Sequence, residues 1–387
     1  MNKKPLAFAL ISQTAYWITA ASAALFVPLE PQFTQQDVYQ RILPYPLWTL
    51  GNFDGIHYTR IAEHGYRPFD YPFFPLYPLV IRLLHTATLL SYLGSAILIS
   101  IASLTAALYL VQKLSRIDHA DSTLLFGIIL LFPTAFFYGA AYNDSLFFML
   151  ATATLFMGRR KLWLSACLIA TLATLTRLNG LALAFFLAAE YLGMQAPMRF
   201  TDVKREFGKI HESVKDIHTL VRSGILAILL IPGAFVCYLA YIQYAAGSWR
   251  MLFDGMKTWQ QDKPVIPFQV FWRYFNIIVL HPQWTLTYAV AAIELGFVLF
   301  YLGMLVYSYK KIRFSYWIFC AVSILIPSLT GTFQGMPRYG LHLYPLFLSV
   351  SIVLKQSRPS RRLLYFAISG ILLYICVSLF TRGYFIS

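Results

Sequence analysis

The sequence contains few charged residues and very few acids. Of its 387 residues, 12% are Asp, Glu, Lys or Arg, against about 25% in a typical soluble domain. Hydrophobic residues make up 58% of the chain, and long apolar runs recur from one end to the other, as membrane-spanning helices require. The shortage of charge excludes a soluble domain of ordinary composition and predicts an all-α polytopic membrane protein.

Several kinds of reactive motif are also absent from the sequence. It has no HExxH motif, no paired DxD motif and no glycine-rich phosphate loop before a helix. Because such motifs mark metal and nucleotide sites, we expect no metal, no cofactor and no cytosolic nucleotide donor. All four cysteines fall in predicted membrane spans, which predicts no disulfide framework; they are Cys167, Cys237, Cys320 and Cys376.

Eleven apolar segments are predicted to cross the membrane within one integral membrane domain, residues 1–387. These segments are 6–28, 93–112, 122–139, 143–157, 162–177, 180–196, 221–246, 285–308, 314–330, 339–354 and 363–381. Several are shorter than the usual length of about 20 residues, so we expect some helices to end inside the protein. The apolar segment 73–90 is instead predicted to be a juxtamembrane helix.

The basic residues predict the orientation of the chain, because Lys and Arg accumulate in cytoplasmic loops. If 73–90 does not cross, most of the 31 basic residues lie on the same side as the N-terminus. The net charge of +15 then reflects membrane topology, and no nucleic-acid partner is expected. Residues 197–220 are basic with one apolar helical face, which predicts an amphipathic helix on the inner leaflet or a loop that only enforces topology.

This orientation places several polar segments together on the external side of the membrane. They are the loop 29–92, two tight turns, the aromatic loop 247–284 and a helix break near residue 335. The candidate site residues in these segments are Asp54, His57, Asn143, Asp144, Arg177, Asn179, Gln334 and Arg338. Their gathering on one face predicts a functional site there.

Asp54 is the candidate general base. It is flanked by Gly51 and Gly55, and glycines allow a ligand to approach the backbone closely. A partly buried carboxylate can take a proton from a hydroxyl group. The alternative is that Asp54 caps the helix that follows it, since Asp is a favoured N-cap residue.

The two external arginines are candidate phosphate ligands. An arginine at the rim of a membrane cavity requires a partner or an anionic ligand, and guanidinium binds phosphate through charge-assisted bonds. Arg177 fits this description, whereas Arg338 is expected either to contact phosphate or sugar or to pair with an acid. Asp144 is either a helix cap or a second acid in the same pocket, and His342 is expected to be a packed helix residue.

Four short motifs resemble the PIG-V family, the second mannosyltransferases of GPI-anchor synthesis and their prokaryotic relatives. In order they are "FDGIHYTRIAEHGY" with "FFPLYPL", "FFYGAAYNDSLFFML", "ATLTRLNGLAL" and "MPRYGLHLYPLF", spread over residues 50–350. The family pattern has Trp where this chain has Phe53 and Glu where it has Asp144. The second difference leaves the role of position 144 less secure than that of Asp54.

The resemblance implies a GT-C-type glycosyltransferase fold, with juxtamembrane helices in the first external loop. It also implies that Asp54 is the base of an inverting transfer, most simply of mannose, from a polyprenyl-phosphate donor to a lipid or glycolipid acceptor. Arg338 and Arg177 would hold the departing phosphate. The expected sugar or acceptor contacts are His57, Asn143, Asp144, Asn179 and Gln334.

The expected location is the external face of a prokaryotic plasma membrane, or the lumenal face of the endoplasmic reticulum in a eukaryote. Two alternatives remain open from the sequence. One is a GT-C transferase for another lipid-linked sugar, such as arabinose. The other is a glycolipid transporter or flippase, which would be expected to carry its polar groups at the bilayer midplane.

Overall fold

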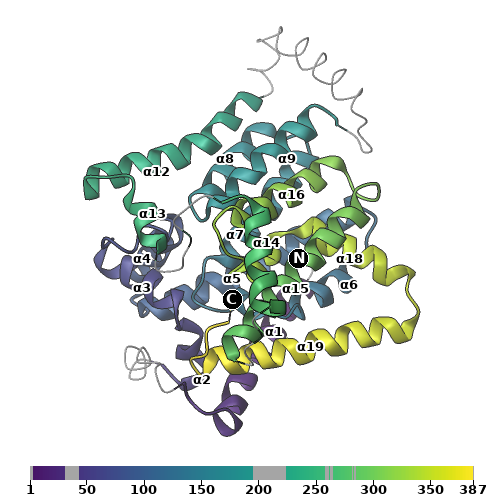
Figure 1. The fold of residues 1–387 in the computed structure, drawn as a ribbon. Helices are drawn as coiled ribbons and strands as arrows, with labels where there is room; N and C mark the ends of the chain where they lie inside the picture. Colours follow the sequence, from purple (N-terminus) through teal and green to yellow (C-terminus); the bar gives the residue numbers. More distant parts are fainter. Residues whose placement is uncertain are drawn as a thin grey trace.

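The computed structural model describes residues 3–30, 43–194, 224–257, 261, 265–280, 282 and 285–386. In this part of the chain every regular element is a helix and no strand occurs (Figure 1). The predicted all-α class is therefore confirmed.

The helices of the first half of the chain mostly overlap the predicted apolar segments. They are α1 (Lys4–Phe26), α2 (Tyr45–Trp48), α3 (Asp54–His64), α4 (Leu76–Thr88), α5 (Tyr92–Ile117), α6 (Ser122–Leu130), α7 (Asp144–Arg159), α8 (Trp163–Thr174) and α9 (Ala182–Tyr191). Short 3₁₀ turns join some of them: η2 (Thr49–Gly51), η3 (Ala135–Tyr138) and η4 (Leu178–Leu181).

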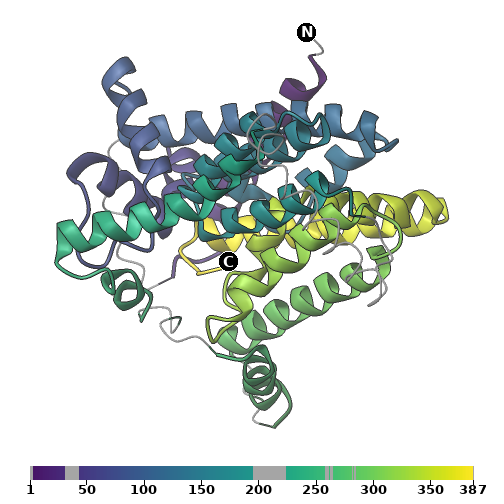
Figure 2. The same cartoon turned by 90° about the horizontal axis from the view of Figure 1, so that it is seen from above.

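The second half of the chain also consists of helices joined by short turns. Its helices are α12 (Leu230–Ala246), α13 (Met251–Met256), α14 (Pro267–Phe275), α15 (Leu286–Ser308), α16 (Phe314–Ser328), α17 (Met336–Tyr339), α18 (Tyr344–Gln356) and α19 (Pro359–Thr381). The short turns are η5 (Ile225–Leu229), the π-helical η7 (Asn276–Leu280) and η8 (Gly340–His342). Figure 2 shows α14 extending away from the other helices.

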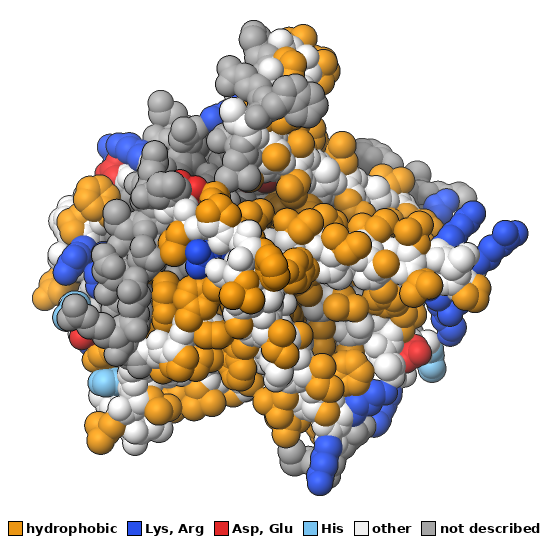
Figure 3. All heavy atoms as spheres, turned by 90° about the horizontal axis from the view of Figure 1, so that it is seen from below, with side chains coloured by type: hydrophobic (Ala, Val, Ile, Leu, Met, Phe, Trp, Pro, Cys, Tyr) orange, Lys and Arg blue, Asp and Glu red, His pale blue; other side chains and the backbone are white. Residues whose placement is uncertain are grey.

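Four helices in the described residues are long and apolar enough to cross a membrane: Tyr92–Ile117, Ile225–Ala246, Tyr288–Ser308 and Pro359–Thr381. Shorter apolar helices accompany them at Trp163–Thr174, Leu178–Tyr191 and Phe314–Ser328. Hydrophobic side chains cover most of the face seen in Figure 3, whereas lysine and arginine side chains lie toward its edges. The chain is a polytopic membrane protein, and the number of crossings remains a prediction.

Helix α4 bears on the interpretation of segment 73–90. It has 13 residues, which at 1.5 Å per residue gives about 20 Å, too short for a hydrocarbon core of about 30 Å. Its buried face contains Tyr77 and Ile81, while Leu79 and Leu83 are exposed. A short helix with an exposed apolar face agrees with the predicted juxtamembrane position.

The predicted single span over 122–139 is wrong, because helix α6 ends at Leu130 and the chain continues through turns. Pro133 explains the break, since proline lacks the N–H that a continuing helix needs. The broken segment instead packs against the C-terminal part of the site. The Thr134 hydroxyl donates to the carbonyl of Pro337 at 3.0 Å, and the Tyr138 hydroxyl donates to the carbonyl of Leu341.

One of the two long loops predicted from the sequence lies outside the described residues, and the other is described only in part. The basic segment 197–220 lies outside the described residues, as do Trp259 and Trp284 of the loop 247–284. Within that loop, α14 buries Val270 and Tyr274 and exposes an apolar stripe at Phe268, Trp272 and Phe275. Aromatic side chains with this exposure are typical of a membrane interface.

An ion cluster connects helix ends remote from each other in the sequence. Arg159 at the end of α7 pairs with Asp118 after α5, and Arg313 before α16 pairs with Glu190 of α9 at 2.8 Å. The Tyr344 hydroxyl at the start of α18 donates to Asp118 at 2.9 Å. Asp144 and Arg159 lie at opposite ends of α7, so these contacts fix the helix that carries Asp144.

Candidate functional site

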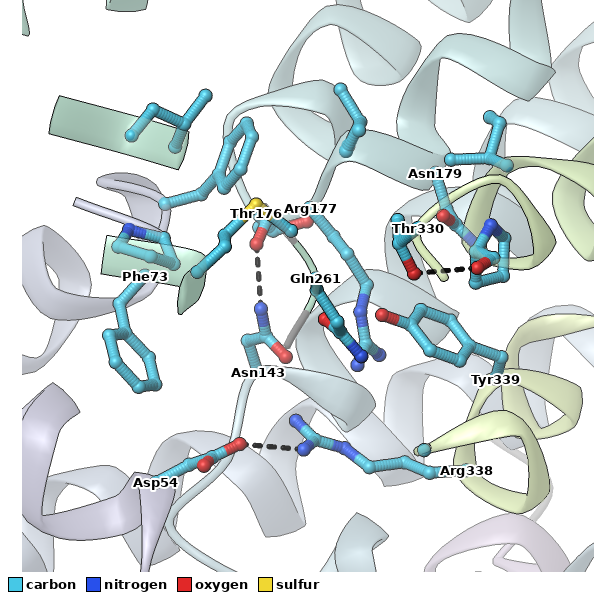
Figure 4. A pocket seen from close by; sticks show the side chains of 18 of the residues that line it. Asp54, Phe73, Asn143, Thr176, Arg177, Asn179, Gln261, Thr330, Arg338 and Tyr339 are labelled. Atoms are coloured by element: carbon cyan, nitrogen blue, oxygen red, sulfur yellow. Dashed lines mark hydrogen bonds and ion pairs between the residues drawn. The ribbon is translucent and has the colours of Figure 1, made fainter. Parts of the chain in front are cut away.

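Five of the polar segments identified from the sequence surround one cavity of about 620 Å³. Figure 4 shows its labelled polar side chains facing one another from different elements. Six of the eight candidate residues line it: Asp54, Asn143, Arg177, Asn179, Gln334 and Arg338. Asp144 and His57 lie behind this lining.

Asp54 is the first residue of α3, and its side chain does not cap that helix. The N-cap residue is Phe53, which makes no side-chain cap hydrogen bond. The Asp54 carboxylate instead accepts a hydrogen bond from Arg338 Nη1 through Oδ2 at 2.7 Å. Of the two interpretations drawn from the sequence, the structure therefore disfavours the helix cap.

Arg338 joins two acids. Its Nη1 donates to Asp54 and its Nε donates to Asp144 Oδ2 at 2.8 Å. Burial alone would lower the pKa of the Arg338 guanidinium, but the carboxylates of Asp144 and Asp54 outweigh it and raise the pKa well above its ordinary value. Gly335 is the N-cap residue of the short helix α17 and has a φ of +83°, a conformation suited to glycine. This residue therefore sets the direction in which the segment enters the helix.

Asp144 is fully buried and accepts from three side chains. Besides Arg338, Arg177 Nη1 lies 2.9 Å from Asp144 Oδ1, and His342 Nε2 lies 2.8 Å from the same oxygen. Arg177 also lies over the Tyr339 ring, with its guanidinium carbon 4.7 Å from the centroid. Asp144 therefore orients the two arginines from behind and does not itself face the cavity.

The charges in this network balance. Asp54 and Asp144 provide two carboxylates, and Arg177 and Arg338 provide two guanidinium groups. An unpaired charge at such depth would be costly, whereas a hydrogen-bonded pair is tolerated. The cavity wall is thus close to neutral before any ligand binds.

The position of Gly180 explains how Arg177 reaches the network. A Cβ atom on Gly180 would lie 2.4 Å from the backbone nitrogen of Thr174, so only glycine allows the chain to fold back on α8 here. Arg177 follows α8 directly in extended conformation. The tight return turns its side chain toward Asp144.

The polar amides have distinct environments. Asn143 donates through Nδ2 to the carbonyl of Thr176 at 2.6 Å, and among the described residues its buried Oδ1 has no hydrogen-bond partner. Asn179 donates to the carbonyl of Ser323 at 3.1 Å. Gln334 lines the cavity one residue before Gly335. Asn143 therefore contributes to the cavity wall, but its Oδ1 is buried and shielded from the cavity.

His57 is one layer removed from the cavity. Its ring stacks on Phe73 with centroids 4.6 Å apart, and Phe73 rather than His57 lines the cavity. His57 Nδ1 lies 3.1 Å from Asp70 Oδ1, and Arg60 pairs with the same carboxylate. The structure thus places His57 in a partly buried polar cluster around Asp70 in the first loop.

His342 and Asp70 are the important residues that sequence reasoning missed. His342 is packed, as expected, but it also contacts Asp144 and Arg177. Its spacing of four residues from Arg338 within "MPRYGLH" would place both on one side of a helical segment, and this was the available signal. Asp70 is one of several acids in a loop already rich in charge, and no local pattern distinguishes it.

The opposite wall of the cavity is apolar. It is formed by Phe74 after α3, Phe235 of α12, Leu252 and Phe253 of α13, and Ile326 of α16. The cavity is therefore amphipathic, with ions and amides on one side and hydrocarbon on the other. In the part of the chain that the structure describes, no group of three or more His, Cys, Asp or Glu side chains is arranged to hold a metal ion.

Comparison with known proteins identifies the family. Residues 7–317 match the family model described as "Mannosyltransferase (PIG-V)". The chain belongs to the PIG-V mannosyltransferase family. The match includes Asp54, Asp144 and Arg177, whereas Arg338 and His342 lie beyond it.

Curated relatives agree with this family. The human GPI alpha-1,6-mannosyltransferase 2 is 27% identical over 250 residues, which cover 60% of this chain and 49% of the relative. The proteins of the same name from Cricetulus griseus and Mus musculus are each 30% identical, over 216 and 215 residues. These matches cover 50% and 51% of this chain and 41% of each relative. The chain therefore spans about half the length, or less, of each curated relative that it matches. No solved structure matches the chain.

Proposed function

We propose that this PIG-V family member is an inverting mannosyltransferase with a GT-C-type fold. It transfers mannose from a polyprenyl-phosphate donor to a hydroxyl of a lipid-linked or glycolipid acceptor at the external membrane face. The observation that carries this proposal is the contact between Asp54 and Arg338 at the wall of an amphipathic cavity. A base for the acceptor and a cation for the phosphate are thus adjacent.

In the proposed reaction the acceptor oxygen bonds to the anomeric carbon as the bond from that carbon to the phosphate oxygen breaks. Asp54 takes the proton of the attacking hydroxyl. Polyprenyl phosphate leaves as an anion, stabilised by Arg338 and Arg177. No co-reactant is needed, because the electron pair of the broken bond stays on the phosphate.

Arg338 has to serve two anions in turn. Without a donor it binds Asp54, and the balanced network leaves no surplus positive charge. A donor phosphate therefore competes with Asp54 for the Arg338 guanidinium. As Arg338 turns to the phosphate, Asp54 becomes free to accept a proton, so the base is activated only when the donor is bound.

The remaining candidate residues divide into two groups. Asn143, Asn179 and Gln334 line the cavity, and their amide groups are proposed to contact hydroxyl groups of the sugar or the acceptor. Asp144 and His57 lie behind the lining and are proposed to act by holding Arg338, Arg177 and the first loop in place.

The apolar wall is proposed to hold the first isoprene units of the donor. It is formed partly by α12 and α16, and α12 exposes large apolar side chains such as Leu230, Val236 and Tyr244. The donor could then enter sideways while its lipid tail stays in the bilayer. Free mannose phosphate lacks this tail and is expected to be a poor donor.

The direct test uses purified protein, radiolabelled polyprenyl-phosphate mannose and a native lipid extract, with identification of the labelled product. The wild-type protein should form a mannosylated lipid, and Asp54→Asn should lower transfer by at least about a thousandfold. Donor binding should be retained, because Arg177 and Arg338 remain and the charge that competes with the phosphate is gone. The variant should still fold, because Arg338 stays paired with Asp144. Full activity of Asp54→Asn would remove Asp54 as the base.

Two further outcomes separate the alternatives. Transfer only from another lipid-linked sugar, such as arabinose, would keep the mechanism and replace mannose. Movement of the lipid-linked sugar across vesicle membranes without any transfer would indicate a flippase.

A further inference from the structure

A buried tyrosine holds the turn that presents Asp54. The side chain of Tyr142, the residue before Asn143, is 2% exposed. Its hydroxyl accepts a hydrogen bond from the backbone N–H of Asp54 at 3.2 Å and donates to the carbonyl of Asn52 at 2.8 Å. One oxygen atom therefore connects the residues on both sides of Phe53.

The turn between these two contacts is conformationally strained. Phe53 has a φ of +57° and a ψ of −115°, a combination that side-chain-bearing residues rarely adopt. Such a conformation persists only where surrounding contacts over-determine it. The Phe53 ring packs against Phe380 and Phe385, with centroids 5.4 and 5.3 Å away, and Asn52 donates to the carbonyl of Phe380 at 3.1 Å.

Tyr142 also contacts the partner of Asp54. The guanidinium carbon of Arg338 lies 4.6 Å from the centroid of the Tyr142 ring, within the range of a cation–π interaction. The hydroxyl of Tyr142 thus fixes the backbone of Asp54, while its ring supports Arg338. Tyr142 therefore contacts both members of the ion pair between Asp54 and Arg338.

We infer that Tyr142 is a positioning residue, which uses its hydroxyl to hold the strained Asn52–Asp54 turn so that the Asp54 carboxylate faces the cavity. This inference rests on the proposed role of Asp54 as the base. Without the hydroxyl, the N–H of Asp54 and the carbonyl of Asn52 lose a buried partner, and Phe53 can relax toward negative φ. The carboxylate would then move away from the acceptor hydroxyl.

The test is Tyr142→Phe, which removes the hydroxyl and keeps the ring beneath Arg338. Because displacement of a catalytic group by about 1 Å can cost up to about a hundredfold, we expect kcat to fall by at least about tenfold. The KM for the donor should change less than about twofold, since Arg338 keeps its aromatic support. A raised KM for the donor with an unchanged kcat would overturn the inference.

Tyr16→Phe is the matched control. Tyr16 is also 2% exposed, and its hydroxyl donates to a backbone carbonyl, that of Leu130, at 3.1 Å. It lies on α1 and does not line the cavity. It should lose stability much as Tyr142→Phe does, while kcat stays within about twofold of wild type. An equal fall in kcat for both variants would mean that Tyr142 acts only through stability.

A second comparison tests whether the hydroxyl of Tyr142 acts through the strained turn. Phe53→Gly removes the penalty for positive φ, so the hydroxyl of Tyr142 should matter less in this background. We expect the loss in kcat caused by Tyr142→Phe to shrink by at least about threefold in the presence of Phe53→Gly. An undiminished loss would show that the strained turn is not what the hydroxyl controls.

A comparison of Asp54→Asn with Tyr142→Phe separates this inference from the proposed function. If Asp54→Asn is inactive and Tyr142→Phe has wild-type kcat, Asp54 remains the base and Tyr142 is not a positioning residue. If Asp54→Asn retains full transfer, the proposed base is wrong and the inference fails with it.

Discussion

Arg338 donates a hydrogen bond through Nε to Asp144 at 2.8 Å, although 194 positions separate the two residues in the sequence. The same guanidinium contacts Asp54. The proposed base and the buried acid behind it therefore share one cation. Substitutions of Arg338 and Asp144 are expected to affect stability and transfer together.

Arg338→Met should be strongly destabilising. It leaves Asp144 buried with one arginine fewer and removes the partner of Asp54, and breaking a buried ion pair typically costs about 3–5 kcal/mol. Arg338→Lys should cost less, because the charge remains, but an ammonium group cannot reproduce the two-directional contact of guanidinium. Unfolding in detergent and mannose transfer would be measured for both. A stable and active Arg338→Met protein would contradict this arrangement.

Asp144→Asn and Asp144→Glu should differ in degree. The amide leaves two arginines without their shared carboxylate, and we expect a loss of about 3–5 kcal/mol in unfolding free energy. Glutamate keeps the charge, but its extra methylene must fit a fully buried site, for a cost of about 1–3 kcal/mol. Thermal unfolding of both variants would check the order. Equal stability of the two would show that charge at this position is unimportant.

His342 should contribute through its contact with Asp144. His342→Ala removes a buried hydrogen bond to a charged group, which is worth about 1.5–3 kcal/mol. His342→Gln can restore a donor and should recover part of the loss. His85→Ala is a suitable control, since His85 is located in α4 and does not line the cavity. If His342→Ala matched that control in both stability and transfer, the contact between His342 and Asp144 would make no measurable contribution.

Asp70 should make stability depend on pH in the acid range. Burial alone would raise the pKa of Asp70, but the hydrogen bond from His57 and the charge of Arg60 lower it below its ordinary value. A carboxyl whose pKa is lower when folded stabilises the protein fully above the unfolded pKa, about 3.9. This contribution is lost as the pH falls through the lower folded-state value.

Asp70→Asn should therefore be less stable near neutral pH by about 1–3 kcal/mol and should lose less further stability below about pH 4. The measurement is the unfolding midpoint as a function of pH. Glu63→Gln is the matched control, because Glu63 lies in the same loop with its side chain 49% exposed, and its profile should follow the wild type. Parallel acid profiles for Asp70→Asn and wild type would exclude Asp70 as the source.

The helices and the polar segments could be predicted from the sequence because their signals are local. Apolar runs indicate α1, α5 and α19, and glycine, proline and charge mark the segments that surround the cavity. The break after α6 was missed, although Pro133 was visible, because the hydrophobic run around it is continuous. Hydropathy alone does not register the loss of one backbone donor.

The pairing of the site residues could not be predicted, because it depends on packing between distant parts of the chain. Arg338 and Asp54 are 284 positions apart, and no local pattern indicates which acid an arginine will contact. Phe53 illustrates the same limit, since its positive φ is imposed by Tyr142 and its aromatic neighbours rather than by its own preference.

The balance of two carboxylates and two guanidinium groups also bears on how a catalytic cycle would close. In the proposed reaction Asp54 gains a proton as the carrier phosphate leaves the sugar. Arg338 then faces a neutral acid and an anionic phosphate, so the spent carrier is held more tightly than the donor was. Its departure should be coupled to the return of that proton to water.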